Sequence, residues 1–356
     1  MMKTLKFWYA IIGVLSLISW IEGFSVPASV SKTSTRKFDY KGFECFSDLT
    51  KPSPHNKNEN KKNPEVILIH GFGCSTVYWR ETKKFLVEDG YTVHAVDLLG
   101  QGKSAKPGKQ NGIHYSIDLW ADMVNEYIES YVESEEIVLI GNSLGSVVAL
   151  TVATNGQMKE GVSVKGIGMF NCGIGMNFRN ILKEPNRTPF ERLFLNAVFG
   201  TLDFLLFGNI PLLDYLLKNV VTKELLKETL INLYPNAINA EQRVDEELVD
   251  SFFLPAQDEG SVEALSQIYV NDAGKTPMQL HERSENIQDL PIHLVWGTYD
   301  NVTPLSGSVG QFYTQLSKNQ KQKVTMDLVE GGHVLFDEVP ECNSYMLKWL
   351  NQLALQ

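Results

Sequence analysis

The chain has few cysteines, and their spacing matches neither a disulfide framework nor a metal site. Four occur among the 356 residues, far apart in the sequence, at Cys45, Cys74, Cys172 and Cys342. No Cys-x-x-Cys pair is present, and no histidine lies at the spacing from a cysteine that a zinc site requires. We therefore expect four free thiols and no metal site.

Positive charge is also scarce. The chain carries 32 lysines and arginines against 42 aspartates and glutamates, which gives a formal net charge of -10. A nucleic-acid partner requires a basic face that releases counterions from phosphates, and the sequence has no basic stripe. We therefore predict no nucleic-acid partner. The hydrophobic content of 43% is high enough for a large core, which excludes a chain that is disordered throughout.

A long uncharged run occurs at the N-terminus, from Phe7 to Ile21, and follows Lys3 and Lys6. Its 15 residues are short for a bilayer span, which takes about 17 to 25. A basic region followed by an apolar run predicts a signal peptide over residues 1–23. A signal anchor that stays attached is the alternative.

The next segment, residues 24–38, has many hydroxyl side chains, several basic ones and no acidic one. This composition is typical of a transit peptide. A signal peptide followed by such a segment beginning with Phe24 resembles the two-part presequences of algae whose plastids lie behind an endoplasmic-reticulum membrane. The resemblance implies import into a plastid and peripheral association with plastid membranes. Secretion, or residence in the endoplasmic reticulum, is the alternative.

Beyond residue 38, short β-branched runs alternate with longer segments of helical periodicity. This order predicts the α/β class, with a mostly parallel sheet flanked by helices. Strands are expected at Val66–Ile69, Thr92–Val96, Ile137–Ile140, Val164–Phe170, Ile292–Trp296 and Lys323–Val329. Between the second and third strands, Ser116 is placed to cap a helix whose apolar residues recur at helical spacing up to Tyr131.

The alternation is absent from residues 173–290, where helical periodicity prevails and no strand is predicted. We interpret this segment as a helical cap inserted into an α/β core formed by residues 39–172 and 291–356. From Leu193 to Val221 the cap is very apolar, yet no uncharged stretch there exceeds ten residues, so a membrane helix is not expected.

One predicted strand runs directly into a Gly-x-Ser-x-Gly sequence centred on Ser143, and a helical pattern follows. A strand, a sharp turn and a helix are the setting in which a serine projects as a nucleophile. The turn leaves no room for side chains two residues before and after the serine, and Gly141 and Gly145 meet that requirement. We therefore predict that Ser143 is the nucleophile.

A serine nucleophile needs a base that is itself oriented by a third group. In this type of fold the chain order is serine, acid, histidine. Asp300 follows the predicted strand at 292–296, and His333 follows the last predicted strand. We therefore predict that His333 is the general base and that Asp300 orients it. Five of the other six histidines are less suitable because they lie inside predicted strands, early in the chain or in the cap: His70, His94, His114, His281 and His293.

The oxyanion of the reaction intermediate needs two hydrogen-bond donors. One is expected to be the backbone N–H of Leu144, directly after the nucleophile. The other is expected to be the N–H of Phe72, in the glycine-containing loop after the first parallel strand. In that loop His70 is expected to serve packing rather than catalysis. This mechanism requires no metal and no organic cofactor.

Five motifs together resemble the α/β hydrolases, over about residues 38–353. They are His70-Gly71-Phe72-Gly73, the segment Asp97 to Ser104, Gly141-Asn142-Ser143-Leu144-Gly145, Gly297-Thr298-Tyr299-Asp300 and Gly332-His333. The resemblance implies the α/β-hydrolase fold, a catalytic triad and an ester substrate.

More narrowly, the segment Tyr115 to Trp120, Asn142 and the residues from Asp337 to Glu341 resemble the pheophytinases and related plastid chlorophyll dephytylases. Those enzymes hydrolyse the phytyl ester of chlorophyll pigments, so the resemblance implies a small hydrophobic ester as substrate. The chain departs from the pheophytinase pattern at His70, at Ser146 and directly after His333.

The apolar half of the cap is expected to pack on the core, and some of it to line a channel for a long acyl or isoprenoid chain. Phe204 and Phe207 are the candidate substrate-binding residues. Alternatives on the same scaffold are a general carboxylesterase or lipase, a lactone hydrolase or lyase, and a binding protein without catalysis. Epoxide hydrolases and haloalkane dehalogenases are disfavoured because they need a carboxylate where this chain has Ser143.

Overall fold

The computed structural model describes residues 32–53, 63–155, 161–184, 187–237, 240–320 and 323–355. The expected signal peptide and residues 24–31 of the expected transit-like segment lie outside these ranges. In the described part of the chain, eight strands form one sheet in the order β1-β2-β4-β3-β5-β6-β7-β8. Their bounds are β1 Lys32–Tyr40, β2 Phe43–Lys51, β3 Glu65–Ile69, β4 Val93–Asp97, β5 Glu136–Ser143, β6 Ser163–Cys172, β7 Ile292–Gly297 and β8 Val324–Val329.

The six predicted strands correspond to β3 through β8, and all of them are mutually parallel. This arrangement confirms the predicted fold class. Along β3, Val66 and Leu68 pack into one core cluster, whereas Ile67 and Ile69 pack into another on the opposite face. Because both faces of the sheet are buried, these strands are continuously apolar rather than alternating.

The antiparallel hairpin of β1 and β2 was not predicted from the sequence. It joins the sheet through pairing of β2 with β4. The first strand among the described residues therefore begins at Lys32, inside the stretch 24–38 that was interpreted as transit-like. The polar sequence of β1 is tolerated because it is an edge strand, held by backbone hydrogen bonds to β2 and largely open to solvent.

Helices cover both faces of the sheet. On one side lie α3 (Ile117–Tyr131), α4 (Leu144–Asn155) and α13 (Ser308–Asn319), and on the other lie α2 (Arg80–Glu88), α14 (Leu335–Glu338) and α15 (Asn343–Leu353). Helix α3 begins as predicted, because the side chain of Ser116 accepts a hydrogen bond from the N–H of Leu119 at 3.1 Å. Short 3-10 turns are η2 (Thr76–Trp79), η3 (Lys109–Asn111) and η6 (Pro340–Cys342).

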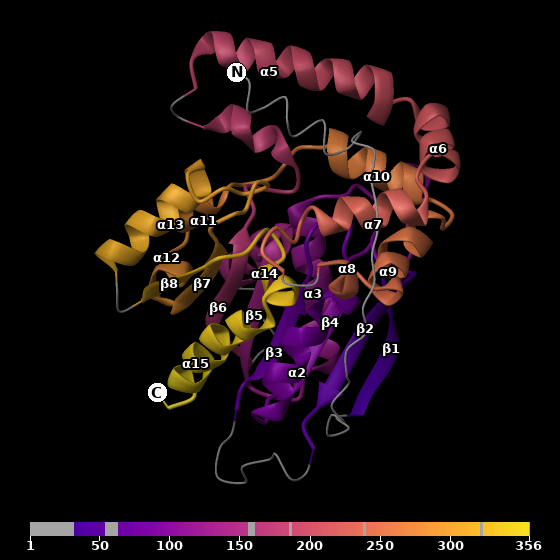
Figure 1. Ribbon diagram of the computed structural model, residues 1–356. Helices are drawn as coiled ribbons and strands as arrows, with labels where there is room; N and C mark the ends of the chain where they lie inside the picture. Colours follow the sequence, from indigo (N-terminus) through magenta and orange to yellow (C-terminus); the bar gives the residue numbers. More distant parts are fainter. Residues whose placement is uncertain are drawn as a thin grey trace.

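Between β6 and β7 the described residues form helices and turns and no strand. The elements are η4 Phe178–Lys183, α5 Pro189–Leu202, the π-helix η5 Asp203–Phe207, α6 Ile210–Asn219, α7 Lys223–Ile231, α8 Ala240–Arg243, α9 Glu246–Ala256, α10 Ser261–Val270, α11 Pro277–Arg283 and α12 Glu285–Asp289. Figure 1 shows α5, α6 and α10 gathered at one end of the molecule, beyond the sheet.

Within the described ranges, no single helix is long and apolar enough to cross a membrane. Residues Pro189–Phe207 and Ile210–Asn219 meet the criteria of length and composition only as a pair, and the two are bent by 68° relative to each other.

Candidate active site

Ser143 lies at a strained turn between β5 and α4. Its backbone φ is 53°, in the left-handed region that non-glycine residues rarely adopt. The neighbouring glycines permit this turn. A Cβ on Gly141 would lie 2.4 Å from the backbone of Gly145, and a Cβ on Gly145 would lie 2.1 Å from the carbonyl oxygen of Ile69. The geometry therefore explains why both positions must be glycine.

Ser143 and His333 line the same cavity, whose volume is about 810 Å³. The Nδ1 atom of His333 lies 2.8 Å from Oδ2 of Asp300, which is almost fully buried. A proton on Nδ1 is donated to Asp300 in this arrangement, which leaves Nε2 of the imidazole free to act as a base. The structure thus brings Ser143, His333 and Asp300 together at the carboxyl ends of β5, β8 and β7.

Asp300 is held as a carboxylate by its neighbours. Its Oδ1 atom accepts hydrogen bonds from the N–H groups of Val302 (2.7 Å) and Thr303 (2.9 Å), and its Oδ2 atom accepts one from the hydroxyl of Thr303 (2.7 Å). Burial raises the pKa of this carboxyl, but attraction to His333 and these hydrogen bonds outweigh burial and hold the pKa below its usual value. The residue is therefore charged when it orients the histidine.

Sequence analysis missed Asn171, whose side chain forms hydrogen bonds to both of the loops that carry Asp300 and His333. Its side-chain Nδ2 donates to the carbonyl oxygens of Gly332 and His333, both at 2.8 Å, and its Oδ1 accepts from the N–H of Gly297 at 2.7 Å. Asn171 is fully buried and has a φ of 46°. A polar residue at the end of an apolar strand was the only signal in the sequence.

The two expected oxyanion donors belong to segments that border the same cavity. Leu144 is the first residue of α4, and Phe72 lies in the loop after β3; both line the cavity with Ser143. The loop passes close to the nucleophile, since a Cβ on Gly71 would lie 3.3 Å from the Cβ of Ser143. Backbone N–H groups at such positions can stabilise a developing oxyanion.

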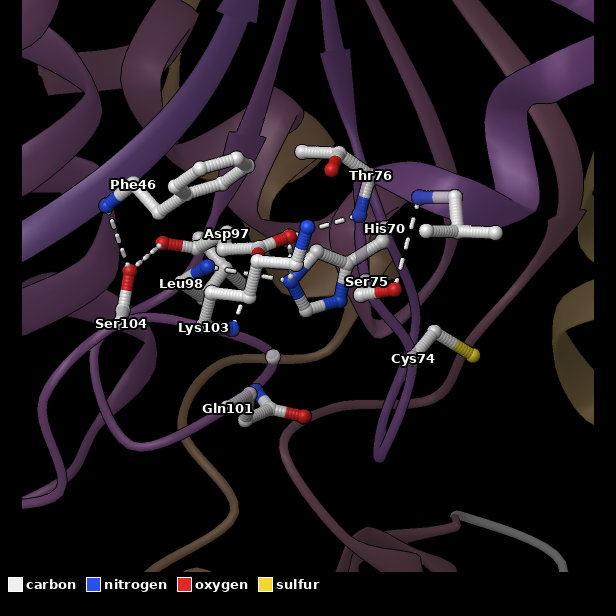
Figure 2. Close-up of polar contacts among 12 residues, drawn as sticks. Phe46, His70, Cys74, Ser75, Thr76, Asp97, Leu98, Gln101, Lys103 and Ser104 are labelled. Carbon is white, nitrogen blue, oxygen red and sulfur yellow. Dashed lines mark hydrogen bonds and ion pairs between the residues drawn. The ribbon is translucent and has the colours of Figure 1, made fainter. Parts of the chain in front are cut away.

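Buried polar side chains form hydrogen bonds to the backbone that directly follows Phe72, and Figure 2 shows several of these side chains. Asp97 is inaccessible to solvent and accepts hydrogen bonds from the N–H groups of Thr76 (2.6 Å) and Lys103 (2.8 Å), while burial raises its pKa to about 6. Gln101 Oε1 accepts from the N–H of Gly73 at 2.6 Å. These contacts fix the loop in the shape that faces the cavity.

His70 belongs to this network and does not line the cavity. Its Nε2 accepts a hydrogen bond from the N–H of Leu98 at 3.0 Å, and its Nδ1 lies 2.7 Å from the carbonyl oxygen of Gly71. Burial lowers the pKa of His70 to about 4, so the ring is neutral near pH 7. The geometry assigns His70 a structural role in the loop.

The cavity wall is largely apolar, and the cap supplies much of it. Its apolar lining residues are Cys74, Tyr78, Leu144, Ile174, Met176, Phe178, Leu233, Phe252, Ile268, Tyr269, Val302 and Val334, with Phe72. Burial raises the pKa of the Cys74 thiol to about 12, so this cysteine is not a competing nucleophile at neutral pH. All four cysteines are buried free thiols, as expected.

The prediction that Phe204 and Phe207 line the cavity is wrong. Phe204 is 82% exposed, and no residue from Leu193 to Val221 is among the cavity-lining residues. Phe207 is buried and stacks on Tyr269, with 3.8 Å between the ring centroids, but it is not among the cavity-lining residues. The apolar pattern predicted a helix correctly, but it did not determine which helices of the cap face the cavity.

Comparison with known proteins agrees with this fold. Residues 64–165 match the family model described as the alpha/beta hydrolase fold. The solved structure of epoxide hydrolase CorEH superposes with a TM-score of 0.61 at 20% identity, covering 90% of this chain and 100% of that one. A serine hydrolase involved in carbazole degradation, the CarC enzyme, superposes equally well at 18% identity, with the same coverage. These similarities and the topology of the sheet show that the chain has the α/β-hydrolase fold.

The relatives of this chain carry several different names. The uncharacterized hydrolase YugF of Bacillus subtilis is 25% identical, and the match covers 80% of this chain and 89% of that protein. Chloroplastic pheophytinase of Arabidopsis thaliana is also 25% identical, over 83% of this chain and 63% of that protein. The probable lysophospholipase BODYGUARD 1 of the same plant is 34% identical, but over 27% of this chain and 20% of that protein.

Proposed function

We propose that this protein is a serine carboxylic-ester hydrolase that acts on a long-chain hydrophobic ester, such as the phytyl ester of chlorophyll pigments. One observation carries the proposal. Ser143, on a strained turn, shares an apolar cavity with His333, whose Nδ1 lies 2.8 Å from the buried carboxylate of Asp300.

In the proposed reaction, Ser143 Oγ attacks the ester carbonyl carbon while its proton passes to Nε2 of His333. The N–H groups of Phe72 and Leu144 stabilise the oxyanion, and one such donor contributes roughly 3 to 4 kcal/mol. The carbon–oxygen bond to the alcohol then breaks, and His333 gives its proton to the departing alkoxide. A water molecule activated by His333 attacks the acyl-enzyme, releases the acid and restores the serine.

The identity of the nucleophile favours an ester over an epoxide or a haloalkane. Epoxide hydrolases and haloalkane dehalogenases use a carboxylate at the elbow to form an alkyl ester, and a serine alkoxide gives no hydrolysable ester from those substrates. Ser143 forms an acyl-enzyme only with an acyl donor. This supports an ester or lactone as substrate.

The cavity supports a large apolar substrate. Its volume of about 810 Å³ lies within the range of about 300 to 1,000 Å³ for ligand pockets, and its wall is mostly hydrophobic. Each buried methylene contributes about 0.8 kcal/mol, so a long chain binds far more tightly here than a short one. Similarity to a protein named pheophytinase is a second support for a phytyl ester. A general carboxylesterase or lipase is the alternative.

An ester panel tests this proposal. Purified protein is incubated with pheophytin, chlorophyll, a galactolipid and short p-nitrophenyl esters, and kcat/KM is compared. We expect a clear preference for the phytylated pigments. If kcat/KM on acetate and butyrate esters were equal to kcat/KM on the phytylated pigments, the protein would be a general carboxylesterase instead.

The proposed location is a plastid, reached through the two-part presequence of residues 1–38. A fluorescent fusion of residues 1–45 should enter the plastid of an alga with a complex plastid, and Phe24→Ala should divert it from the stroma. Export of the unmodified fusion into the medium would refute this location.

A further inference from the structure

Thr303 binds both oxygens of the buried carboxylate. Its backbone N–H donates a hydrogen bond to Oδ1 of Asp300 at 2.9 Å, and its hydroxyl donates one to Oδ2 at 2.7 Å. Rotation of the carboxylate about its Cβ–Cγ bond would break both of these hydrogen bonds. Thr303 therefore fixes the orientation in which Asp300 faces the histidine.

The hydroxyl of Thr303 and the imidazole of His333 share one oxygen atom. Oδ2 of Asp300 lies 2.7 Å from Oγ1 of Thr303 and 2.8 Å from Nδ1 of His333, and these two donor atoms are 3.4 Å apart. The other oxygen, Oδ1, accepts from the backbone N–H groups of Val302 and Thr303. Among the residues that the structure describes, Thr303 is thus the only side chain besides His333 that donates to this carboxylate.

The backbone on either side of Thr303 holds it in place. Thr303 precedes Pro304, which restricts the backbone of the residue before it to extended conformations. Its carbonyl oxygen accepts a hydrogen bond from Nε1 of Trp296 at 3.1 Å, and Trp296 is fully buried in β7. A threonine is also stiff at χ1 because it is β-branched. Its hydroxyl is therefore directed at Asp300 with little loss of side-chain freedom.

The charge of Asp300 depends on these protein donors. The side chain of Asp300 is inaccessible to solvent, and Asp300 is not among the described residues that line the cavity shared by Ser143 and His333. Thr303 does line that cavity, so it lies at the boundary between the cavity and the carboxylate. Water does not replace a hydrogen bond that a buried carboxylate loses. Removal of the Thr303 hydroxyl therefore changes the charge that Oδ2 presents to the imidazole.

This change bears on the strength of the general base. In the proposed reaction, Nε2 of His333 takes the proton of Ser143, and Oδ2 of Asp300 stabilises the imidazolium that forms. An oxygen that also accepts a hydrogen bond from Thr303 presents less negative charge to Nδ1, and this makes Nε2 less basic. A less basic imidazole stays neutral, and able to take a proton, at a lower pH.

We propose that Thr303 is a positioning residue that fixes the carboxylate of Asp300 and extends the activity of His333 as a base to lower pH. This inference rests on the proposed function, since it concerns the same three catalytic residues. It adds a fourth residue, which acts on the reaction only through Asp300.

No charged side chain faces the imidazole across the cavity, within the part of the chain that the structure describes. The lining residues include no Asp, Glu, Lys or Arg. The titratable lining residues other than the histidine are Cys74, Tyr78 and Tyr269, and burial raises the pKa of each. The cap and the loop after β3 therefore add no charge that would change near neutral pH.

The acidic groups on the other side of the histidine are held apart from Thr303. Glu338, on α14, accepts hydrogen bonds from backbone N–H groups, and burial raises its pKa. Asp337, on the same helix, forms an ion pair with Arg80, and Glu330 is exposed. Substitutions at position 303 leave all of these groups in place, so a difference between the pH profiles of such variants reports on Thr303.

Substitutions at position 303 separate the hydroxyl from the rest of the side chain. Thr303→Val replaces the hydroxyl by a methyl group of similar size, Thr303→Ala also lacks the hydroxyl, and Thr303→Ser keeps it. The matched control is Thr154→Val, at a partly buried threonine near the end of α4 whose hydroxyl donates to the carbonyl oxygen of Leu150 at 2.7 Å. The rate constant of fluorophosphonate labelling at Ser143 is measured in the full chain from about pH 5 to about pH 9.

We expect Thr303→Val to raise the midpoint of the acid limb of the labelling profile by about 0.5 to 1 pH unit, a roughly 3- to 10-fold change in proton affinity, because Oδ2 then holds the imidazolium more tightly. The rate above the midpoint should fall by up to about tenfold, since the carboxylate is less well oriented. Thr303→Ala should behave like Thr303→Val. Thr303→Ser should keep the midpoint of the unmodified protein, and Thr154→Val should change neither quantity.

Three results would overturn the proposal. If Thr303→Val and Thr303→Ala lower the rate without moving the midpoint, the residue has a structural role only. If Thr303→Ser moves the midpoint as far as Thr303→Val, the methyl group and not the hydroxyl is responsible. If Thr154→Val moves it equally, the effect is not specific to Asp300. Labelling does not depend on which ester is hydrolysed, so a failed ester panel leaves this test intact, whereas absence of labelling at Ser143 in the unmodified protein would refute the triad itself and this proposal with it.

Discussion

Replacing Asn171 by alanine removes the three hydrogen bonds that join the strand end of β6 to the loops of Asp300 and His333. Each contributes about 0.5 to 1.5 kcal/mol net, and alanine at a φ of 46° adds about 1 kcal/mol of backbone strain. We therefore expect the free energy of unfolding to fall by about 2.5 to 5.5 kcal/mol.

The effect on catalysis should exceed what lost stability explains. Without the Asn171 side chain, the carbonyl oxygen of Gly332 and the N–H of Gly297 lose their shared partner. The loops of His333 and Asp300 are then no longer fixed relative to each other. A misplacement of about 1 Å at a reacting group can cost roughly 100-fold in rate. We expect kcat for an ester to fall about 10- to 100-fold in folded protein, with KM nearly unchanged.

The matched control is Asn343→Ala. Asn343 is equally buried, donates to the carbonyl oxygens of Phe336 and Pro340, and accepts from the hydroxyl of Thr82. The substitution Asn343→Ala therefore removes a similar set of hydrogen bonds, none of which involves the backbone of Gly297, Gly332 or His333. Thermal unfolding and steady-state kinetics on a soluble ester are measured for both variants. If Asn171→Ala kept the kcat of the control, the argument that Asn171 positions the triad would be refuted.

Three further predictions follow from the site. Asp300→Asn should lower kcat by about 10⁴-fold, measured with a soluble ester, because the amide no longer holds the imidazole in the required tautomer; a loss under tenfold would contradict its role. Because burial raises the pKa of Asp97 to about 6 in the folded state, above the usual value near 3.9, the folded state binds a proton more tightly than the unfolded state. The stability that Asp97 contributes is therefore present below about pH 4 and is lost as the pH rises to about 6. The free energy of unfolding of Asp97→Asn, measured with denaturant, should not show this decline with pH. A pH profile that is the same in Asp97→Asn and in the unmodified protein would refute the prediction. Phe252→Ser, in the cavity wall, should reduce kcat/KM for a phytyl ester more than for an acetyl ester, whereas the neighbouring Phe253→Ser, outside the lining, should affect both equally; equal losses for Phe252→Ser would indicate a structural role.

The local parts of the site could be predicted from the sequence because their determinants are local. The turn at Ser143 needs glycines two residues away on each side, and the strand before it has an apolar run that is visible in the sequence. Asp300 and His333 follow strands in the order that the fold requires. No comparison of distant segments was needed to find these three residues.

Other parts depend on contacts between distant segments, which the sequence does not reveal. Asn171 acts through Gly297 and Gly332, more than 120 residues away along the chain. The helical periodicity of the apolar segment around Phe204 was visible in the sequence, but a helix face that lines a cavity and one that faces outward have the same periodicity. Strand β1 is mostly polar, with buried apolar side chains only at Phe38 and Tyr40 near its end, and its pairing with β2 depends on backbone hydrogen bonds.

The central claim, that Ser143 is a nucleophile activated by His333, is tested most directly with a fluorophosphonate probe. The probe reacts covalently with activated serines, and mass spectrometry of the digested protein identifies the modified residue. We predict one labelled peptide, modified at Ser143, with labelling abolished in Ser143→Ala and strongly slowed in His333→Ala. Labelling at another residue, or undiminished labelling and ester hydrolysis in Ser143→Ala, would contradict the account.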